Sequence, residues 1–351
     1  MLERMSKAGK IKDSKLLSKS EIFAKKDDIP TDIPIINIAL SGSIHKGISS
    51  GLTFLAGPSR HFKSLLGLLF VKAYLNKYPD AICLFYDAEY GITSEYITAN
   101  GIDPDRVLHI PIVHLEELKF DIANRLEAIT KEDKVIIFID SIGNLASKKE
   151  ADDAINENSA ADMTRAKTLK GLFRIITPHL PKKDIPLIAI NHVYQEMGLF
   201  PKTIMGGGSG PMLGANQVFF IGKAQEKDGT ELVGYNFTLL ADKSRFVKEK
   251  SKFKFTVTYD RGIEKYSGLM DIAIDAGIVV KPSNGFYQKV NLETGEPEGK
   301  KYRMKETFNK EFWDDILTSK EFENYVAKTY KLGYNSLMTE EEEETEQNET
   351  E

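Results

Sequence analysis

The 351-residue chain lacks several features that define large classes of protein. Its one cysteine, Cys83, excludes an intrachain disulfide framework and a zinc site built from several cysteines. No run approaches 18 apolar residues, so we expect no transmembrane helix, and the lysine-rich N-terminus has no apolar segment of the kind found in secretory signals. These absences predict a cytosolic protein that makes no contact with a membrane.

The net charge is also small, at −5, but it is unevenly distributed. Residues 339–351 contain eight glutamates and no basic residue, and the rest of the chain carries +3. Residues 1–26 hold eight lysines and arginines against three acids. A basic arm and an acidic tail around a balanced body are typical of proteins that bind nucleic acid, although a solvated arm and a solubilising tail would give the same pattern.

Apolar runs alternate with amphipathic stretches from residue 35 to about residue 255. The uninterrupted runs predict strands at 52–56, 81–86, 107–110, 135–139 and 186–190. Amphipathic spacing predicts helices at 65–77, 94–100, 115–129 and 163–176. The alternation is typical of an α/β core with a mainly parallel sheet covered on both faces. Later strands at 218–221, 235–240 and 254–259 follow one another without long helices, so we expect antiparallel pairing at one edge.

The two ends of the chain form separate regions. A short helix near 14–20 and an extended arm precede the core, and a small α+β unit follows it, with a helix at 269–277, a hairpin within 283–300 and one amphipathic helix at 311–330. We therefore divide the chain into an arm at 1–34, a core at 35–268, a small C-terminal domain at 269–338 and a disordered acidic tail at 339–351.

A phosphate-binding loop is the first motif with chemical meaning. The residues between the first predicted strand and helix read Gly57, Pro58, Ser59, Arg60, His61, Phe62, Lys63 and Ser64. This G-x5-K-S spacing is that of a P-loop, in which backbone N–H groups surround the β-phosphate, the lysine reaches the β- and γ-phosphates, and the serine hydroxyl binds Mg²⁺. The loop departs from the usual pattern because Phe62 stands where a second glycine is expected.

Three further strand ends carry side chains suited to nucleotide hydrolysis. Asp140 ends an apolar strand and could hold Mg²⁺, or it could simply cap the next segment. Glu89 could orient and deprotonate the attacking water, or it could lie in a solvated turn. His192 could sense the γ-phosphate, although a single histidine is more often structural.

Seven stretches together resemble one known family. They cover residues 37–42, 57–64, 83–89, 138–150, 163–167, 205–212 and 248–253. From about residue 35 to residue 287 the chain resembles the RecA-type strand-exchange recombinases, in particular the UvsX group of T-even-like tailed bacteriophages. Phe62 is similar to the residue that this phage group carries in its loop.

The resemblance implies a RecA-type P-loop fold and a role for each motif residue. Lys63 and Ser64 correspond to the P-loop pair and Asp140 to the acid beside Mg²⁺. Glu89 corresponds to the catalytic base, and His192 stands in the place of a bacterial glutamine that senses the γ-phosphate. ATP and Mg²⁺ are the implied cofactors.

Other implied roles involve a second subunit. Tyr96 matches a tyrosine that stacks on adenine, while Lys243 and Arg245 match two basic residues that enter a neighbour's ATP site. Phe23 is expected to dock into an apolar pocket of the adjacent core, which would build a head-to-tail helical filament.

DNA binding is expected at two loops, residues 147–163 and 194–216, that we predict to have no regular structure of their own. The candidate contacts are Arg165, Lys167, Phe200, Lys202, Gly206, Gly207 and Gly208. Glycines permit close approach to phosphates and apolar side chains can wedge between bases, so sequence-independent binding is expected.

The resemblance implies an ATP-dependent recombinase that forms filaments on single-stranded DNA and pairs it with homologous double-stranded DNA. Its implied partners are a single-strand-binding protein and a recombination mediator, in the cytoplasm of a bacterial host. A hexameric DNA helicase shares the same core and is the alternative enzyme. A mediator that binds ATP without hydrolysis is a third possibility, which the intact Lys63, Glu89 and Asp140 disfavour.

Overall fold

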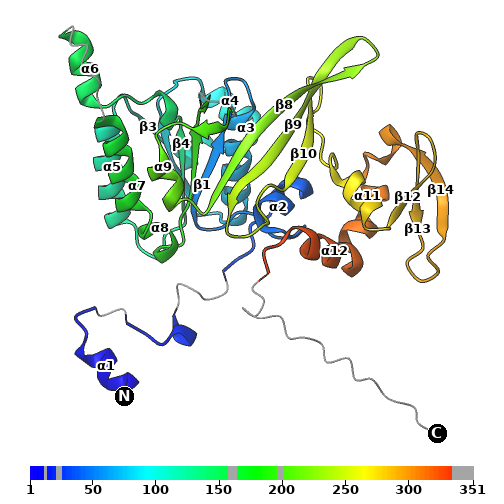
Figure 1. The fold of residues 1–351 in the computed structure, drawn as a ribbon, viewed down its shortest axis with the longest axis horizontal. Coiled ribbons are helices and arrows are strands. Elements are labelled where there is room, and N and C mark those ends of the chain that lie inside the picture. Colours follow the sequence, from blue (N-terminus) through cyan, green and yellow to red (C-terminus); the bar gives the residue numbers. More distant parts are fainter. Residues whose placement is uncertain (12–13, 21–25, 157–163, 197–200, 334–351) are drawn as a thin grey trace.

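The computed structural model describes residues 1–351 except 12–13, 21–25, 157–163, 197–200 and 334–351. Nine strands of this described part form one sheet in the order β11-β10-β9-β8-β1-β5-β4-β2-β3 (Figure 1). The parallel strands are β1 (Gly51–Ala56), β2 (Ile82–Asp87), β3 (Val107–Pro111), β4 (Val135–Asp140) and β5 (Pro186–Asn191). The predicted parallel core is confirmed.

The other half of the sheet is antiparallel, as the later strands predict. It consists of β8 (Gln217–Asp228), β9 (Glu231–Ser244), β10 (Lys252–Thr258) and β11 (Gly262–Ile263). β8 joins the halves because it runs parallel to β1 and antiparallel to β9. Both β8 and β9 are longer than predicted and form a hairpin that rises beyond the sheet (Figure 1). Its outer part, residues 222–231, is mostly polar and so carries no uninterrupted apolar run.

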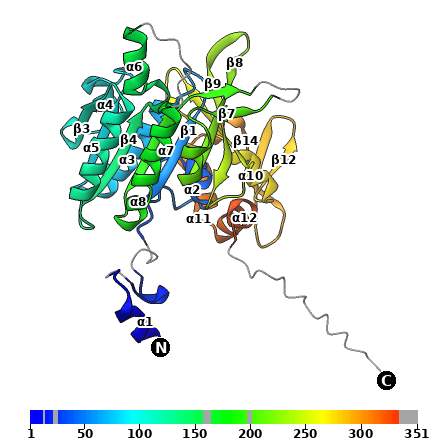
Figure 2. The ribbon, with the colours of Figure 1, turned by 60° about the vertical axis from the view of Figure 1, so that its left-hand side comes forward.

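Helices cover both faces of the parallel half (Figure 2). On β4, Ile136 and Phe138 face the cluster built with α3 (Lys63–Lys77), while Ile137 and Ile139 face the cluster built with α5 (Leu115–Ala128) and α7 (Thr164–Ile176). α3 approaches the sheet closely, since a Cβ at Gly67 would lie 2.3 Å from the Phe138 ring. This two-sided burial explains why the strands read as uninterrupted apolar runs.

Both loops predicted to lack regular structure contain some, and that prediction was wrong. The first contains α6 (Lys148–Ile155), which Ser147 caps by accepting a hydrogen bond from Glu150 N at 3.1 Å. The second contains a hairpin of β6 (Val193–Gln195) and β7 (Thr203–Met205), followed by α9 (Ser209–Gly214). These elements are too short to give a periodic pattern.

The C-terminal region has its own three-stranded sheet. Its elements are α10 (Leu269–Asp275), β12 (Val279–Ser283), β13 (Phe286–Val290), β14 (Pro297–Arg303), η5 (Met304–Thr307), α11 (Lys310–Thr318) and α12 (Lys320–Tyr330). The single helix predicted for 311–330 is wrong, because Ser319 adopts an extended conformation, ends α11 and caps α12. The Glu323 carboxylate fixes this region to the core by accepting hydrogen bonds from the Ser43 hydroxyl at 2.6 Å and from Ile44 N at 3.2 Å.

The N-terminal region contains α1 (Leu2–Ala8), which was not predicted, and one turn of 3-10 helix, η1 (Leu17–Lys19), where a short helix was expected. Its base is attached to the core by an ion pair of 2.7 Å between Lys26 and Asp184. Two further helices flank the core, α2 (Pro34–Ser41) and α4 (Ser94–Ala99). No helix in the described ranges is long and apolar enough to span a membrane.

Candidate active site

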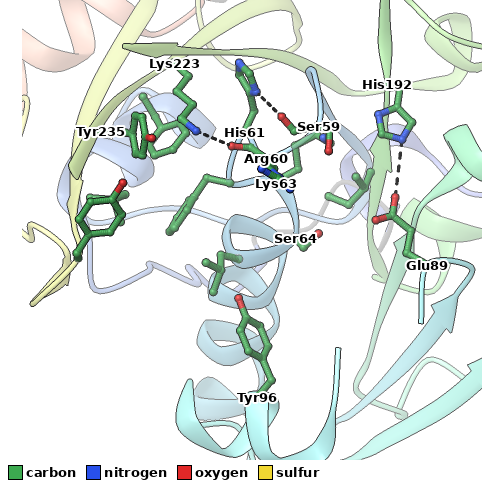
Figure 3. Close-up of a pocket in the computed structure, with 16 residues that line it drawn as sticks. Ser59, Arg60, His61, Lys63, Ser64, Glu89, Tyr96, His192, Lys223 and Tyr235 are labelled. Atoms are coloured by element: carbon green, nitrogen blue, oxygen red, sulfur yellow. Dashed lines mark hydrogen bonds and ion pairs between the residues drawn. The ribbon is translucent and has the colours of Figure 1, made fainter. Parts of the chain in front are cut away.

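The predicted strand-end residues meet at one edge of the sheet. The P-loop follows β1, Glu89 follows β2, Asp140 ends β4 and His192 follows β5. Because these strands are parallel and adjacent, their carboxyl ends converge. There the P-loop, Glu89 and His192 border a cavity of about 420 Å³, while Asp140 is buried beside Ser64 and is not part of the lining. The lining consists of Ser59, Arg60, His61, Phe62, Lys63, Ser64, Glu89, Tyr96 and His192, together with residues from the antiparallel strands (Figure 3).

The backbone of the P-loop is shaped to bind an anion. Arg60 and Phe62 have positive φ angles of 60° and 62°, and α3 begins at Lys63. Left-handed residues within such a turn direct successive N–H groups inward, and the start of a helix adds a favourable field. Gly57 and Pro58 border a neighbouring cavity rather than this one, and the Pro58 carbonyl accepts a hydrogen bond from Lys63 Nζ at 2.7 Å.

Phe62 has a structural role that a glycine could not supply. Its ring packs against Phe237 of β9 and Phe255 of β10, with ring centroids 5.2 and 6.0 Å apart. A left-handed conformation costs a side-chain-bearing residue roughly 1–2 kcal/mol, and aromatic packing of this kind offsets such a cost. The loop is thereby attached to the antiparallel half of the sheet.

Two charged groups are buried beneath the loop. Lys63 is only 7% exposed, and burial lowers its pKa while the carboxylates of Glu89 and Asp140 oppose that shift. Asp140 is 2% exposed, and burial raises its pKa to about 6, against the effect of a hydrogen bond from Ser64. The negative charges of Glu89 and Asp87 add to this rise.

The surroundings of Asp140 fit a magnesium ion. Its Oδ1 atom is buried and has no hydrogen-bond partner, and the Ser64 hydroxyl is its neighbour. Among the described residues no group of three or more His, Cys, Asp or Glu side chains could hold a metal alone. Mg²⁺ bound with phosphates commonly takes one or two protein oxygens and completes its shell with phosphate and water.

Glu89 and His192 are joined by a residue that sequence reasoning assigned no role. Asn144, in the turn η4 (Ile142–Asn144), donates from Nδ2 to Glu89 Oε1 at 3.0 Å. His192 Nε2 lies 3.1 Å from Asn144 Oδ1 and 3.8 Å from Glu89 Oε1, and this second approach is drawn in Figure 3. Burial lowers the pKa of His192, with the charge of Lys63 adding to the effect, so the neutral ring is favoured.

The backbone that carries Glu89 is held in place by the carboxylate of Asp87. Asp87 Oδ1 accepts hydrogen bonds from Glu89 N at 3.0 Å and Tyr90 N at 2.8 Å. Its other oxygen lies 3.0 Å from His109 Nε2, on the neighbouring strand β3. The strand-end acid Asp87 therefore positions the catalytic candidate two residues later.

The far wall of the cavity comes from the antiparallel strands. It contains Lys223, Tyr235, Phe237, Val257 and Tyr259. Lys223 Nζ lies 3.7 Å from the centre of the Tyr235 ring and donates to the Arg60 carbonyl at 3.2 Å (Figure 3). Tyr96 lines the same cavity from α4, so aromatic rings from two elements border it. Sequence reasoning missed this wall because its members form no local motif; alternation along the predicted strands was the one available signal.

Lys243 and Arg245 do not line this cavity. Lys243 Nζ donates to the carbonyls of Met212 at 2.7 Å and Leu213 at 3.2 Å, at the end of α9, and burial lowers its pKa with the charge of Arg245 adding to the effect. Arg245 is exposed. Within this chain neither side chain reaches the P-loop cavity.

The candidate DNA contacts lie in different surroundings. Lys167 and Lys202 are exposed, whereas the Arg165 guanidinium donates to the carbonyls of Leu145, Ile142 and Gly143 at 2.9, 3.1 and 3.1 Å. The Gly206 carbonyl accepts from Asn191 Nδ2 at 2.9 Å, and the adjacent residues Gly207 and Gly208 have positive φ angles. Phe200 and the arm residue Phe23 lie outside the described residues.

Two family models match the chain. One, described as the RecA N-terminal domain, matches residues 17–264. The other, described as the C-terminal domain of the bacteriophage T4 recombination and repair protein, matches residues 266–326. The chain belongs to the RecA family.

Individual relatives agree with this membership. The chain is 52% identical over 334 residues to the recombination and repair protein of Enterobacteria phage T4, covering 94% of this chain and 85% of that protein. It is 25% identical over 297 residues to protein RecA of Cutibacterium acnes, covering 83% and 82% of the two chains. It is 27% identical over 298 residues to protein RecA of Tropheryma whipplei, covering 83% of this chain and 64% of that protein.

Proposed function

We propose that this protein is an ATP-dependent DNA recombinase that assembles on single-stranded DNA and catalyses homologous pairing and strand exchange. The observation that carries the proposal is that four side chains, those of Lys63, Asp140, Glu89 and His192, lie together at one phosphate-binding loop. The chain that carries them is 52% identical to a phage recombination and repair protein. A hexameric helicase shares this core, but the similarity of the C-terminal region to that phage protein favours a recombinase.

ATP would bind with its phosphates on the backbone N–H groups of the P-loop. Lys63 would supply a positive charge at the β- and γ-phosphates, and its exchange of the Pro58 carbonyl for phosphate oxygens would strengthen that contact. Tyr96 would support the adenine ring. Ser64 and Asp140 would hold Mg²⁺, which neutralises charge on the transferring phosphate when it is bound.

Glu89 would act on the attacking water. Its carboxylate would orient the water and accept its proton as the water oxygen approaches the γ-phosphorus. His192, 3.8 Å from Glu89, would donate a hydrogen bond to the γ-phosphate and respond to its presence. His192 directly precedes β6, the first strand of the hairpin β6–β7. Loss of the γ-phosphate on hydrolysis would therefore change the conformation of this DNA-binding segment.

DNA contacts would be made by exposed lysines and by glycine backbone. Lys167 and Lys202 would contact phosphates, and the segment Gly206–Gly208 would allow the DNA backbone close to the root of the hairpin. Phe200, which lies outside the described residues, would contact bases. The guanidinium of Arg165 would have to leave its backbone carbonyls to serve as a further phosphate contact.

Assembly would complete the site. Lys243 and Arg245 would approach the nucleotide of a neighbouring subunit and stabilise charge in the transition state. A cavity of about 390 Å³, which has Ile82, Leu84 and Leu108 among its apolar lining residues and charged residues beside them, offers a receptor for Phe23 of the adjacent arm. Head-to-tail repetition of this contact would give a helical filament.

The test measures ATP hydrolysis with and without single-stranded DNA, for the wild type and for Glu89→Gln. We expect strong stimulation by DNA in the wild type, and a loss of about 10²–10⁴-fold in the variant with retained ATP and DNA binding. The exposed Glu293→Gln serves as a matched control that should hydrolyse ATP normally.

Electron microscopy with a slowly hydrolysed ATP analogue should show helical filaments on single-stranded DNA. A hydrolysis rate independent of DNA, or closed rings in place of filaments, would exclude the recombinase assignment. Normal turnover by Glu89→Gln would remove Glu89 from the role of base while leaving the class of protein open to the other two measurements.

A further inference from the structure

The amide of Asn144 connects the two side chains that the proposed mechanism uses. It lies between Glu89 and His192, at 3.0 Å from the first and 3.1 Å from the second. The direct separation of those two side chains, 3.8 Å between Glu89 Oε1 and His192 Nε2, is too long for a hydrogen bond. Asn144 is therefore the hydrogen-bonded bridge of this trio.

The chemistry of the bridge fixes the direction of both hydrogen bonds. An ionised carboxylate only accepts, so the amide NH₂ group must face Glu89. The amide oxygen then faces His192, and a neutral imidazole can satisfy it only by carrying its proton on Nε2. Asn144 thus selects one tautomer of His192, in competition with a hydrogen bond from the ring to the backbone of Gly57.

The turn that carries Asn144 cannot move freely. The guanidinium of Arg165 donates to three backbone carbonyls of this segment, those of Ile142, Gly143 and Leu145. On the opposite side, a Cβ at Gly143 would lie 2.3 Å from His192 Cδ2, so the turn and the imidazole are in close contact. Clamped between Arg165 and His192, the turn holds the Asn144 amide in one place.

We propose that Asn144 is a positioning residue for ATP hydrolysis, which holds the Glu89 carboxylate and sets the tautomer of His192 through one amide group. This inference rests on the proposed function of Glu89 as the base and of His192 as the sensor. When His192 turns its Nε2 proton to a γ-phosphate, Asn144 loses a donor and keeps only its bond to Glu89. Asn144 thus links the sensor His192 to the base Glu89, although the two side chains make no direct hydrogen bond.

Two substitutions separate the halves of the bridge. Asn144→Ala removes both hydrogen bonds. Asn144→Asp has nearly the same shape and keeps an oxygen that accepts from His192, but it replaces the donor to Glu89 with a second carboxylate. Asn236→Ala is the matched control, because Asn236 also bridges a carboxylate, Glu226, and a donor, the hydroxyl of Thr256, on another face of the chain.

The measurements are kcat for DNA-stimulated ATP hydrolysis, the Kd for a non-hydrolysable ATP analogue, and the tautomer of His192 from ¹⁵N NMR of histidine-labelled protein. We expect both Asn144 variants to lose about 10- to 100-fold in kcat, the effect of one hydrogen bond to a charged group, with the Kd changed less than about two-fold. The Nε2–H signal should persist in Asn144→Asp and shift toward the Nδ1–H form in Asn144→Ala. Asn236→Ala should match the wild type in all three.

Several results would overturn the inference. They are an unchanged kcat in Asn144→Ala, an Nε2–H tautomer that survives in that variant, or an equal loss of kcat and analogue affinity, which would indicate only a structural role. The NMR measurement needs no activity, so it separates this inference from the proposed function. If Glu89→Gln hydrolyses ATP normally, the base assignment fails, and the tautomer result still decides whether Asn144 controls His192.

Discussion

The buried carboxyl group of Asp140 should make folding stability depend on pH in a way that Asp140→Asn removes. Burial raises its pKa from the ordinary value of 3.8 to about 6, in a setting that also contains Lys63, Glu89, Asp87 and the hydroxyl of Ser64. Since one pKa unit corresponds to 1.36 kcal/mol, the shift of roughly two units amounts to about 3 kcal/mol.

The sign follows from which state releases the proton first. Below about pH 4 the group is protonated in both the folded and the unfolded chain and has no effect. Between about pH 4 and pH 6 only the unfolded chain ionises, so the free energy of unfolding falls as the pH rises, and above pH 6 the full penalty of about 3 kcal/mol remains. His192, whose pKa is lowered, changes stability in the opposite direction but does so in both proteins.

The assay is urea unfolding of wild type and Asp140→Asn at several pH values from 4 to 8. Circular dichroism is the suitable signal, because the one tryptophan, Trp313, lies on α11 of the C-terminal region and is not among the residues that line the site. The stability of the variant minus that of the wild type should rise by about 2.5 kcal/mol from pH 4 to pH 8, whatever constant offset the new amide introduces. Parallel curves for the two proteins would refute the reasoning, because they would mean that Asp140 titrates as it does in the unfolded chain.

Two further predictions test local geometry. Phe62→Gly and Phe62→Ala remove the same ring contacts, but only glycine relieves the strain of the positive φ of 62°. The glycine variant should therefore be more stable than the alanine variant by about 1 kcal/mol in the same unfolding assay. A more stable alanine variant would contradict this reasoning. Arg165→Ala should reduce DNA stimulation of ATP hydrolysis more than it reduces affinity for single-stranded DNA, because Arg165 holds backbone carbonyls. Lys167→Ala should mainly reduce that affinity and its salt dependence. If both variants lose the same affinity for DNA, Arg165 is a phosphate contact instead.

Much of this site was predictable because its parts follow single strands. A P-loop, a strand that ends in Asp140 and another that leads to Glu89 are local patterns, and parallel strands bring such ends together. The same logic correctly predicted the α/β core and the antiparallel edge. A match to one family then covered most of the chain.

The remaining features depend on contacts that no local pattern encodes. Lys223 reaches the Arg60 carbonyl across the sheet, far from it in sequence, and Asn144 acquires its place only when β2, β4 and β5 are adjacent. The break at Ser319 was hidden because apolar spacing continues through it, while the capping hydrogen bond from Phe322 N to the Ser319 hydroxyl, at 3.1 Å, decides the boundary. The position of Arg165 in the sequence predicted a DNA contact, but its hydrogen bonds hold the backbone of residues 142–145.

The position of β1 in the sheet affects how the protein can be made. This strand precedes the P-loop and is buried along its whole length, yet its two neighbours are β5, which begins at Pro186, and β8, which begins at Gln217. A chain emerging from the ribosome must therefore keep an apolar strand unpaired until more than half of its length has been synthesised. The strand that leads into the P-loop therefore cannot be paired in a nascent chain that ends before Pro186, so the nucleotide site cannot be complete at that stage.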